Sequence, residues 1–360
     1  MKKISIIGTN GLPANYGGWE TLVDHLTLKL NQDFKITVYC SSHSYDKEIT
    51  TINGVDLRYV GLKANGWQSI PYDIVSMFRS FKDDDVLLIL GVSGCIALPL
   101  LKLLGSNFIV VNIDGLEWKR AKWNGFIKNF LKLSEFFAVR YADCVVSDNK
   151  VIQAYIASEY NKTSELIPYG ADQAKPVSLT KALIEQFKFL KGEYAFKVCR
   201  IEPENNLDMI LQAFVANPLM NLVIVGNWNK SEYGIALKRR YAKFDNLYLL
   251  DPIYELDLLN QLRSNCSFYV HGHSAGGTNP SLVEAMYLGL PILAFGVNFN
   301  RETTYHQAIY FSTAAELAQL LVDIKSLDLK AVGIQMKMIA KEHYTWQAVS
   351  DKYKAIFLSA

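Results

Sequence analysis

The segment from His271 to Met286 has the residue types and the spacing of a phosphate-binding turn. An apolar run ends at His271, small residues follow, and a helix is expected to begin at Pro280, since proline suits the first helical turn. Backbone N–H groups at the start of such a helix, together with its positive end, attract anions. Glu284, one turn into the helix, could accept hydrogen bonds from a ribose diol. The candidate ligands before it are Gly277, Thr278, Asn279, Pro280 and Ser281.

The histidines of this segment do not indicate a metal. His271 and His273 have no carboxylate or cysteine partner at ligand spacing, and no Asp-x-Asp motif suited to a metal accompanies them. At least one of the two is expected to be a buried histidine with its hydrogen bonds satisfied.

A second candidate phosphate ligand is Arg200, which follows the apolar run from Tyr194 to Cys199. A cation at the end of a strand, facing the free N–H groups of a following helix, can anchor a diphosphate. The alternative is an exposed arginine in a salt bridge. Tyr254, shortly after the run ending near Leu250, is a candidate for stacking on a nucleotide base.

The first half of the chain has a glycine-bearing loop, Gly8 to Glu20, after its first apolar run. Its spacing differs from the G-x-G-x-x-G turn of dinucleotide-binding enzymes, which disfavours a nicotinamide-dependent enzyme. Gly17 and Gly18, just before a helix, could let the backbone approach a phosphate or a sugar. The alternative is a loop that only reverses the chain.

A cluster of charged and aromatic residues follows the run from Asn107 to Ile113. Asp114 lies where a strand should end, so it could act as a base or bind a substrate hydroxyl, or it could cap a helix. Glu117, Lys119 and Arg120 are candidate acceptor ligands.

The segment 119–132 has five basic and no acidic residues, a composition that suits contact with an anionic membrane surface. The alternative is an ordinary helix with a core stripe of aromatic residues: Phe126, Phe130, Phe137 and Tyr141.

Buried runs alternate with amphipathic stretches along the whole chain, a pattern that predicts parallel sheets covered by helices. The runs lie at 3–8, 35–40, 56–61, 86–90, 107–113 and 143–147, and again at 194–200, 221–226, 246–250, 267–271, 291–295 and 308–311. Two such sets predict two α/β domains, 1–168 and 169–342. The amphipathic segment 343–360 is expected to cross back onto the first domain.

Composition limits the classes of function. A chain of 360 residues suits two domains, and a net charge of +2 does not suggest nucleic-acid binding. Five scattered cysteines without C-x-x-C spacing indicate reduced thiols in a cytoplasmic protein. The apolar segment Val86 to Leu104 is interrupted by glycines and Pro99, so a strand, a turn and a short helix explain it better than a membrane span.

Taken together, these pieces resemble the retaining glycosyltransferases of family 4, which have the GT-B fold of two Rossmann-like domains facing an interdomain cleft. The matching residues are Arg200, the Val223–Gly226 run, the 279–291 segment and the turn Ile167 to Asp172. The Gly8 to Glu20 loop and the Asp114 to Arg120 cluster resemble a bacterial branch that contains rhamnosyltransferases of surface-polysaccharide assembly.

The resemblance implies that Arg200 holds the donor diphosphate and that Glu284 binds the ribose hydroxyls. It also implies that residues 279–281 lie near the sugar and the phosphate, with Gly17 and Gly18 under the diphosphate. Two positions depart from the family pattern. Asn205 stands where the family has a lysine, and Gly276 stands where it has a glutamate that contacts the transferred sugar. A 6-deoxy-L-sugar donor would be consistent with the second change.

The function implied is a metal-independent transfer with retention, in which Asp114, Arg200 and Glu284 are the candidate catalytic residues. The expected donor is dTDP-L-rhamnose. The expected acceptor is a glycan or an undecaprenyl-diphosphate-linked sugar of capsule or O-antigen synthesis, at the cytoplasmic face of the inner membrane. A UDP- or GDP-hexose transferase, a nucleotide-sugar 2-epimerase and a non-catalytic subunit that binds a sugar nucleotide are the alternatives.

Overall fold

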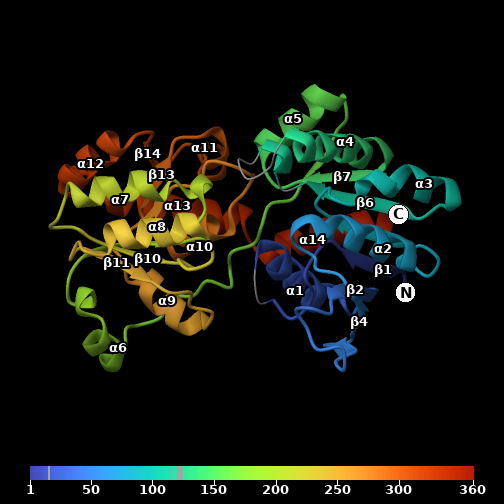
Figure 1. Ribbon diagram of the computed structural model, residues 1–360, viewed down its shortest axis with the longest axis horizontal. Coiled ribbons are helices and arrows are strands. Elements are labelled where there is room, and N and C mark those ends of the chain that lie inside the picture. The colour runs from blue at the N-terminus through green and yellow to red at the C-terminus, as the bar shows by residue number, and fades with distance from the viewer. Residues whose placement is uncertain (15–16, 114, 120–124) are drawn as a thin grey trace. The chain divides into compact units, whose positions relative to one another are not determined.

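The computed structural model describes residues 1–14, 17–113, 115–119 and 125–360 (Figure 1). Asp114 and Arg120, two of the predicted site residues, lie outside the described residues. The chain divides into two compact units. Unit 1 comprises Met1–Gly170 and Trp346–Ala360, and unit 2 comprises Ala171–Thr345.

Unit 1 is built on a sheet that has eight strands among the described residues, in the order β3-β4-β2-β1-β5-β6-β7-β8. Its neighbouring strands are parallel, apart from the antiparallel pair β3 and β4. The strands are β1 (Lys3–Ile7), β2 (Lys35–Ser41), β3 (Thr51–Ile52), β4 (Val55–Val60), β5 (Val86–Leu90), β6 (Phe108–Ile113), β7 (Cys144–Ser147) and β8 (Glu165–Leu166). The helices are α1 (Gly18–Leu30), α2 (Ser69–Ser80), α3 (Leu98–Leu104), α4 (Gly125–Tyr141), α5 (Lys150–Tyr160) and α14 (Trp346–Ser359), with short 3-10 turns η1 (Gly66–Gln68), η2 (Cys95–Ala97) and η3 (Glu117–Lys119).

The apolar segment 86–104 folds as the sequence predicts. All five residues of β5 are buried because this central strand is covered on both faces, and η2 and the seven-residue α3 follow it. Within the described part of the chain, no helix combines the length and the apolar character needed to cross a membrane.

The C-terminal helix α14 belongs to unit 1, where it packs against α1, as Figure 1 shows with α14 in red beside α1 in blue. The ring of Trp346 stacks on His25 with 4.3 Å between centroids, and Phe357 meets the edge of Phe34 at 5.6 Å. A Cβ atom on Gly170 would lie 2.4 Å from the Trp346 ring, so only glycine fits where the chain leaves this unit.

Unit 2 has a parallel sheet of six strands among the described residues, in the order β11-β10-β9-β12-β13-β14. The strands are β9 (Tyr194–Val198), β10 (Asn221–Val225), β11 (Leu247–Leu250), β12 (Phe268–His271), β13 (Ile292–Phe295) and β14 (Ile309–Phe311). The helices are α6 (Lys181–Gln186), α7 (Leu207–Val215), α8 (Glu232–Tyr241), α9 (Leu256–Ser264), α10 (Pro280–Leu288), α11 (Asn298–Thr303), α12 (Ala314–Val322) and α13 (Leu329–His343), with the 3-10 turns η4 (Lys188–Lys191), η5 (Pro203–Asn205) and η6 (Ile324–Ser326).

The predicted α/β class, with parallel sheets in two domains, is confirmed. One prediction within α4 is wrong. Phe126, proposed as part of an aromatic core stripe, is 83% exposed, whereas the buried positions are Leu131, Ser134, Glu135, Ala138 and Val139. The reason is that the carboxylate of Glu135 accepts hydrogen bonds from donors inside unit 1. The side of α4 that carries Glu135 is therefore buried, and the side that carries Phe126 is exposed.

Candidate functional site

The loops that follow β9 and β12 are joined at the carboxyl edge of the unit 2 sheet. These strands are neighbours, although β10 and β11 lie between them in sequence. The Asn206 side chain donates to the carbonyl of Gly272 at 2.8 Å, and Ser274 donates through its backbone N–H (2.8 Å) and its hydroxyl (3.0 Å) to the carbonyl of Glu204. Ligands of parallel sheets bind at this edge. The sheet therefore brings the Arg200 loop and the 272–281 loop together.

Gly272 allows this close approach. A Cβ atom at this position would lie 2.3 Å from the carbonyl oxygen of Asn205 and 2.7 Å from Cδ1 of Ile210. Any other residue would therefore push the two loops apart.

The start of α10 has the geometry that the sequence predicts. Pro280 occupies the first turn, and Asn279 is the N-cap, whose side-chain oxygen accepts from the backbone N–H of Ser281 at 3.1 Å. The Ser281 hydroxyl donates to the same oxygen at 2.8 Å and lies 3.0 Å from the hydroxyl of Tyr269 on β12. Tyr269 also donates to the carbonyl of Val198, at the end of β9. The helix start is thus held against both strands.

Two further residues that are predicted to bind the substrate come just before this helix. Thr278 is buried, and Gly277 next to it belongs to the same loop of small residues. Tyr254 is different: it follows β11 at the edge of the sheet and is 74% exposed. No contact joins Tyr254 to the Arg200 loop or to α10 among the described residues.

Glu284 is held by two neighbours that the sequence analysis missed. Its carboxylate forms an ion pair with the buried Arg263 of α9 and accepts from Nε2 of Gln173 at 2.6 Å. Arg263 also donates to Oδ1 of Asn260 at 2.8 Å. A carboxylate has about four lone-pair sites, so acceptor capacity for a ribose hydroxyl remains. Arg263 could have been noticed as a cation on the apolar side of an amphipathic helix.

Arg200 and Asn205 have different environments. The Arg200 side chain is 48% exposed, and its guanidinium lies 3.7 Å from the carboxylate of Glu202. Such a half-exposed pair is weak and leaves guanidinium N–H groups for a phosphate. Asn205 is buried and donates to the backbone carbonyl of Arg200 at 2.9 Å. Asn205 thus shapes the loop on which Arg200 lies.

Two buried basic side chains lie near this edge of the sheet. Burial lowers the pKa of Lys197 on β9, and burial, together with the charges of Lys197 and His273, lowers the pKa of His271 well below its usual value. Neither ring nitrogen of His271 has a hydrogen-bond partner among the described residues. The prediction that at least one histidine is buried is confirmed for His271. The expectation that its hydrogen bonds are satisfied is wrong, because no described polar group lies within hydrogen-bonding distance of its ring nitrogens.

The glycine pair predicted to face a diphosphate begins α1 in unit 1. Gly17 is the N-cap, with no side-chain hydrogen bond to the first turn, and Gly18 is the first helical residue. The buried carboxylate of Glu20 accepts from the backbone N–H of Asn10 at 2.9 Å. This bond ties the loop after β1 to the first turn of α1.

The described part of the predicted acceptor cluster forms η3, which includes Glu117 and Lys119. Between them, Trp118 donates its indole N–H to the carboxylate of Glu135 on α4, at 3.1 Å. The Tyr155 and Tyr160 hydroxyls each donate to the same carboxylate at 2.5 Å. Glu135 is fully buried and was missed, because an acidic residue within a helix is usually read as solvent-facing.

Comparison with known proteins covers both units. Residues 1–172 match the family model described as a domain of unknown function (DUF1972), and residues 181–327 match the model of the glycosyl transferases group 1.

Several solved structures share the fold over the whole chain. A sucrose-phosphate synthase from Thermosynechococcus elongatus has a TM-score of 0.79 at 15% identity, with 100% of both chains covered. HepE from Anabaena, solved in complex with UDP-glucose, has a TM-score of 0.77 at 14% identity, again with 100% of both covered. The E. coli trehalose-6-phosphate structure bound with UDP-2-fluoro glucose has a TM-score of 0.72 at 11% identity, over 99% of this chain and 98% of that one. The chain therefore has the GT-B fold, and its residues 181–327 match the family model of the glycosyl transferases group 1.

Proposed function

We propose that this protein is a glycosyltransferase that moves a 6-deoxy-L-sugar, with L-rhamnose from dTDP-L-rhamnose as the first choice, onto a glycan or lipid-diphosphate-linked acceptor of bacterial surface polysaccharide. The observation that carries the proposal is the joined pair of loops after β9 and β12. Their hydrogen bonds hold Arg200 and the start of α10 at one edge of the sheet. A cation together with the positive end of a helix suits the diphosphate of a nucleotide-sugar donor.

In the proposed reaction, the bond between the anomeric carbon and the diphosphate oxygen breaks, and negative charge develops on the departing diphosphate. Arg200 and the positive N-terminal end of α10 stabilise that charge in place of a metal. The acceptor hydroxyl attacks on the face that the diphosphate leaves, so the anomeric configuration is retained. Asp114 is proposed to orient or deprotonate that hydroxyl, while Glu117, Lys119 and Arg120 contact the acceptor.

The choice of a deoxy-sugar rests on Gly276. Related glycosyltransferases carry a glutamate here, according to the resemblance noted above, and its carboxylate contacts sugar hydroxyls. Gly276 has a φ of +100°, a conformation that favours glycine, and it offers no side chain to such hydroxyls. A donor that lacks one of the ordinary hexose hydroxyls loses fewer hydrogen bonds when glycine stands in place of the glutamate.

A UDP-hexose donor is the second candidate. It is favoured by the similar structures that carry UDP-glucose or UDP-2-fluoro glucose. We further propose that the protein works in the cytoplasm in peripheral contact with the inner membrane, where a lipid-linked acceptor would be presented.

Thermal-shift measurements with dTDP-L-rhamnose, UDP-glucose and GDP-mannose test the donor. We expect a selective rise in melting temperature with dTDP-L-rhamnose. A rise with UDP-glucose alone would show that the donor is a UDP-hexose instead. Arg200→Ala should remove the rise, because about 1.5–3 kcal/mol of charge-assisted hydrogen bonding is lost. The matched control is Arg239→Ala, an exposed arginine of α8. If both variants bind the donor like the parent protein, the site assignment is wrong.

A further inference from the structure

The solvent-facing side of α3 carries large apolar side chains. Leu103 is 84% exposed, and Leu100 and Leu104 are each at least half exposed, whereas Leu98 and Leu101 face the core. On a protein surface that faces water, contiguous apolar residues of this size mark an interaction site. Because α3 packs beside α4, its exposed leucines adjoin the outer side of that helix.

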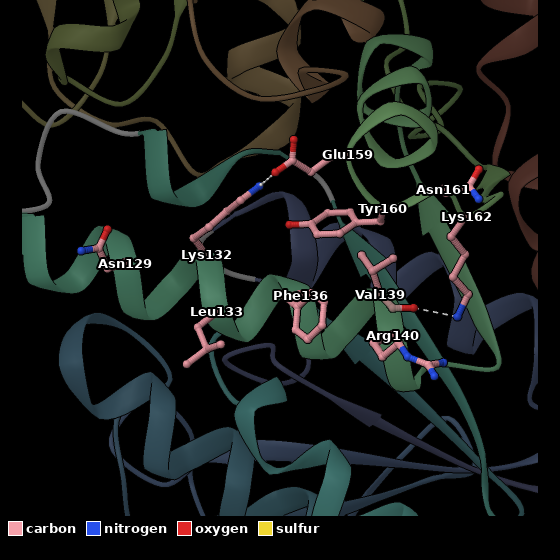
Figure 2. A pocket seen from close by; sticks show the side chains of 10 residues that line it. All are labelled: Asn129, Lys132, Leu133, Phe136, Val139, Arg140, Glu159, Tyr160, Asn161 and Lys162. Carbon is pink, nitrogen blue, oxygen red and sulfur yellow. Dashed lines mark hydrogen bonds and ion pairs between the residues drawn. The ribbon is translucent and has the colours of Figure 1, made fainter.

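The outer side of α4 continues this surface. Phe126, Leu133, Phe136 and Arg140 are all exposed and are spaced by seven, three and four residues, which places them on one stripe of the helix. Figure 2 shows Leu133, Phe136 and Arg140 in sequence along α4. We call the exposed side of α3 together with this stripe the α3–α4 face.

The charged side chains that α3 and α4 themselves expose are basic. Helices α3 and α4 contain Lys102, Lys128, Lys132 and Arg140, and their only acidic residue, Glu135, is fully buried. Acidic neighbours already pair with two of the four cations: Asp143 lies 2.5 Å from Lys102, and Glu159 lies 2.8 Å from Lys132. Lys128 and Arg140 form no ion pair with any described residue.

A cavity of about 750 Å³ opens between α4 and α5, beside this face (Figure 2). Its apolar lining comes from Leu133, Phe136 and Val139. Its charged lining comes from Lys132, Arg140 and Lys162 and from the carboxylate of Glu159, which pairs with Lys132. Lys162 donates to the carbonyls of Val139 and Ala142 at 2.6 and 2.7 Å, so it is engaged with the end of α4. Arg140 is the lining cation whose donors remain available to a ligand.

We propose that the α3–α4 face docks on an anionic lipid surface, with leucine and phenylalanine side chains in the headgroup boundary and Arg140 on a lipid phosphate. Basic residues combined with exposed leucine and phenylalanine are the features by which helices bind at such interfaces. The inference rests on the proposed peripheral contact with a membrane. It moves that contact from the 119–132 segment to α3 and the outer stripe of α4.

A lipid surface fits this face better than a second copy of the chain. A symmetric dimer through the same face would bring Arg140 toward its own copy, and this repulsion disfavours association. Anionic headgroups instead supply the missing negative charge. The binding should therefore depend on both the lipid charge and the salt concentration.

Co-sedimentation of the full chain with vesicles tests the proposal without any sugar donor or acceptor. Two double variants separate the apolar and charged contributions: Leu103→Ser with Phe136→Ser, and Lys128→Glu with Arg140→Glu. The matched controls lie in unit 2. They are Leu219→Ser, at a fully exposed leucine, and Lys188→Glu with Lys191→Glu, at two exposed lysines.

The parent protein should bind vesicles of phosphatidylcholine with phosphatidylglycerol at least about tenfold more tightly than vesicles of phosphatidylcholine alone, and high salt should reduce this preference. Each double variant should weaken binding by about tenfold or more, while the controls bind like the parent. Equal binding to both vesicle types, no binding at all, or undiminished binding by both double variants would overturn the proposal. The proposal would also be overturned if light scattering showed that the double variants differ from the parent in molar mass while they bind vesicles equally well, because the face would then join two copies of the chain. Donor-induced thermal shifts, measured without vesicles, stay intact in every variant if only membrane docking is affected.

Discussion

The indole N–H of Trp118 donates to the fully buried carboxylate of Glu135 at 3.1 Å, which anchors η3 to α4. Lys132 adds a cation to the same cluster, 3.4 Å from Glu135 and 4.9 Å from the centre of the Trp118 ring. Burial lowers the pKa of Lys132, but its contacts with Glu159 and Tyr155 and the charge of Glu135 outweigh this and raise it. The predicted acceptor residues Glu117 and Lys119 therefore project from a turn whose central residue is held by a buried ionic cluster.

Glu135→Gln should lower the free energy of unfolding by about 1–3 kcal/mol, because the amide cannot accept all the hydrogen bonds that Trp118, Tyr155 and Tyr160 donate to the buried carboxylate. Glu159→Gln is the matched control: it removes the other carboxylate that pairs with Lys132, but Glu159 is nearly half exposed and should cost less than about 1 kcal/mol. Urea denaturation measures both values. Equal losses would show that burial of Glu135 adds nothing. Trp118 fluorescence should change in Glu135→Gln and remain unchanged in the control.

Gly272→Ala should impair donor binding more than folding. The new methyl group would meet the carbonyl oxygen of Asn205 at 2.3 Å, so the two loops must separate and displace Arg200 from α10. Gly192→Ala is the control, since nothing lies within 4 Å of a Cβ atom there. Donor titration by calorimetry should show at least about a tenfold loss of affinity in the first variant only. Normal donor affinity in Gly272→Ala would mean that the contact between these loops does not shape the site.

Glu284→Gln should destabilise the protein even without donor. The variant leaves the buried Arg263 without its ion-pair partner, at a cost of about 3–5 kcal/mol. The double variant Glu284→Gln with Arg263→Met removes the stranded charge and should recover part of this loss. If donor affinity stays low in the double variant after stability returns, Glu284 itself binds the donor. If both stability and donor affinity recover in the double variant, Glu284 has only a structural role.

Stability should fall as the pH drops below about 6.5, in part because of His271. Its pKa is well below 6.5 in the folded protein, so the unfolded chain binds a proton there that the native state excludes, and the equilibrium shifts toward unfolding. His271→Leu should therefore melt at an increasingly higher temperature than the parent as the pH falls from about 7 to about 5.5. His43→Leu, at an exposed histidine, should show no such growing difference. A constant difference for His271→Leu would contradict the assignment.

Lys197→Met should stabilise the protein by about 1–3 kcal/mol near neutral pH, because it removes a buried amine that has no ion-pair partner among the described residues. Burial lowers the pKa of Lys197, so the unfolded chain binds more protons than the native state between the lowered value and the usual one. The stability of the parent therefore rises with pH in that window, and the advantage of the variant shrinks. Denaturation at neutral pH and near pH 10 measures this trend. Lys188→Met, at an exposed lysine, is the control, and a destabilised Lys197→Met would show that the amine has a role in the fold.

The local structure of unit 2 around its candidate site follows from the sequence alone. The apolar run ending at His271, the small residues after it and the proline at 280 predict a strand, a loop and the start of a helix, and β12 and α10 follow these bounds within a residue. These features depend on neighbouring residues only: burial selects the strand residues, and the fixed φ of proline suits a first helical turn.

Which of these local elements contact one another depends on the tertiary structure. The order of strands in the sheet places β9 beside β12 and so joins the Arg200 loop to α10, and packing gives Glu284 the buried partner Arg263. It also turned α4 so that Glu135 faces inward and Phe126 outward. A helix with two apolar sides can bury either one, and the choice depends on hydrogen-bond donors such as Trp118 and Tyr155, which other segments bring to it. Such partners are distant in sequence, and no local periodicity records them.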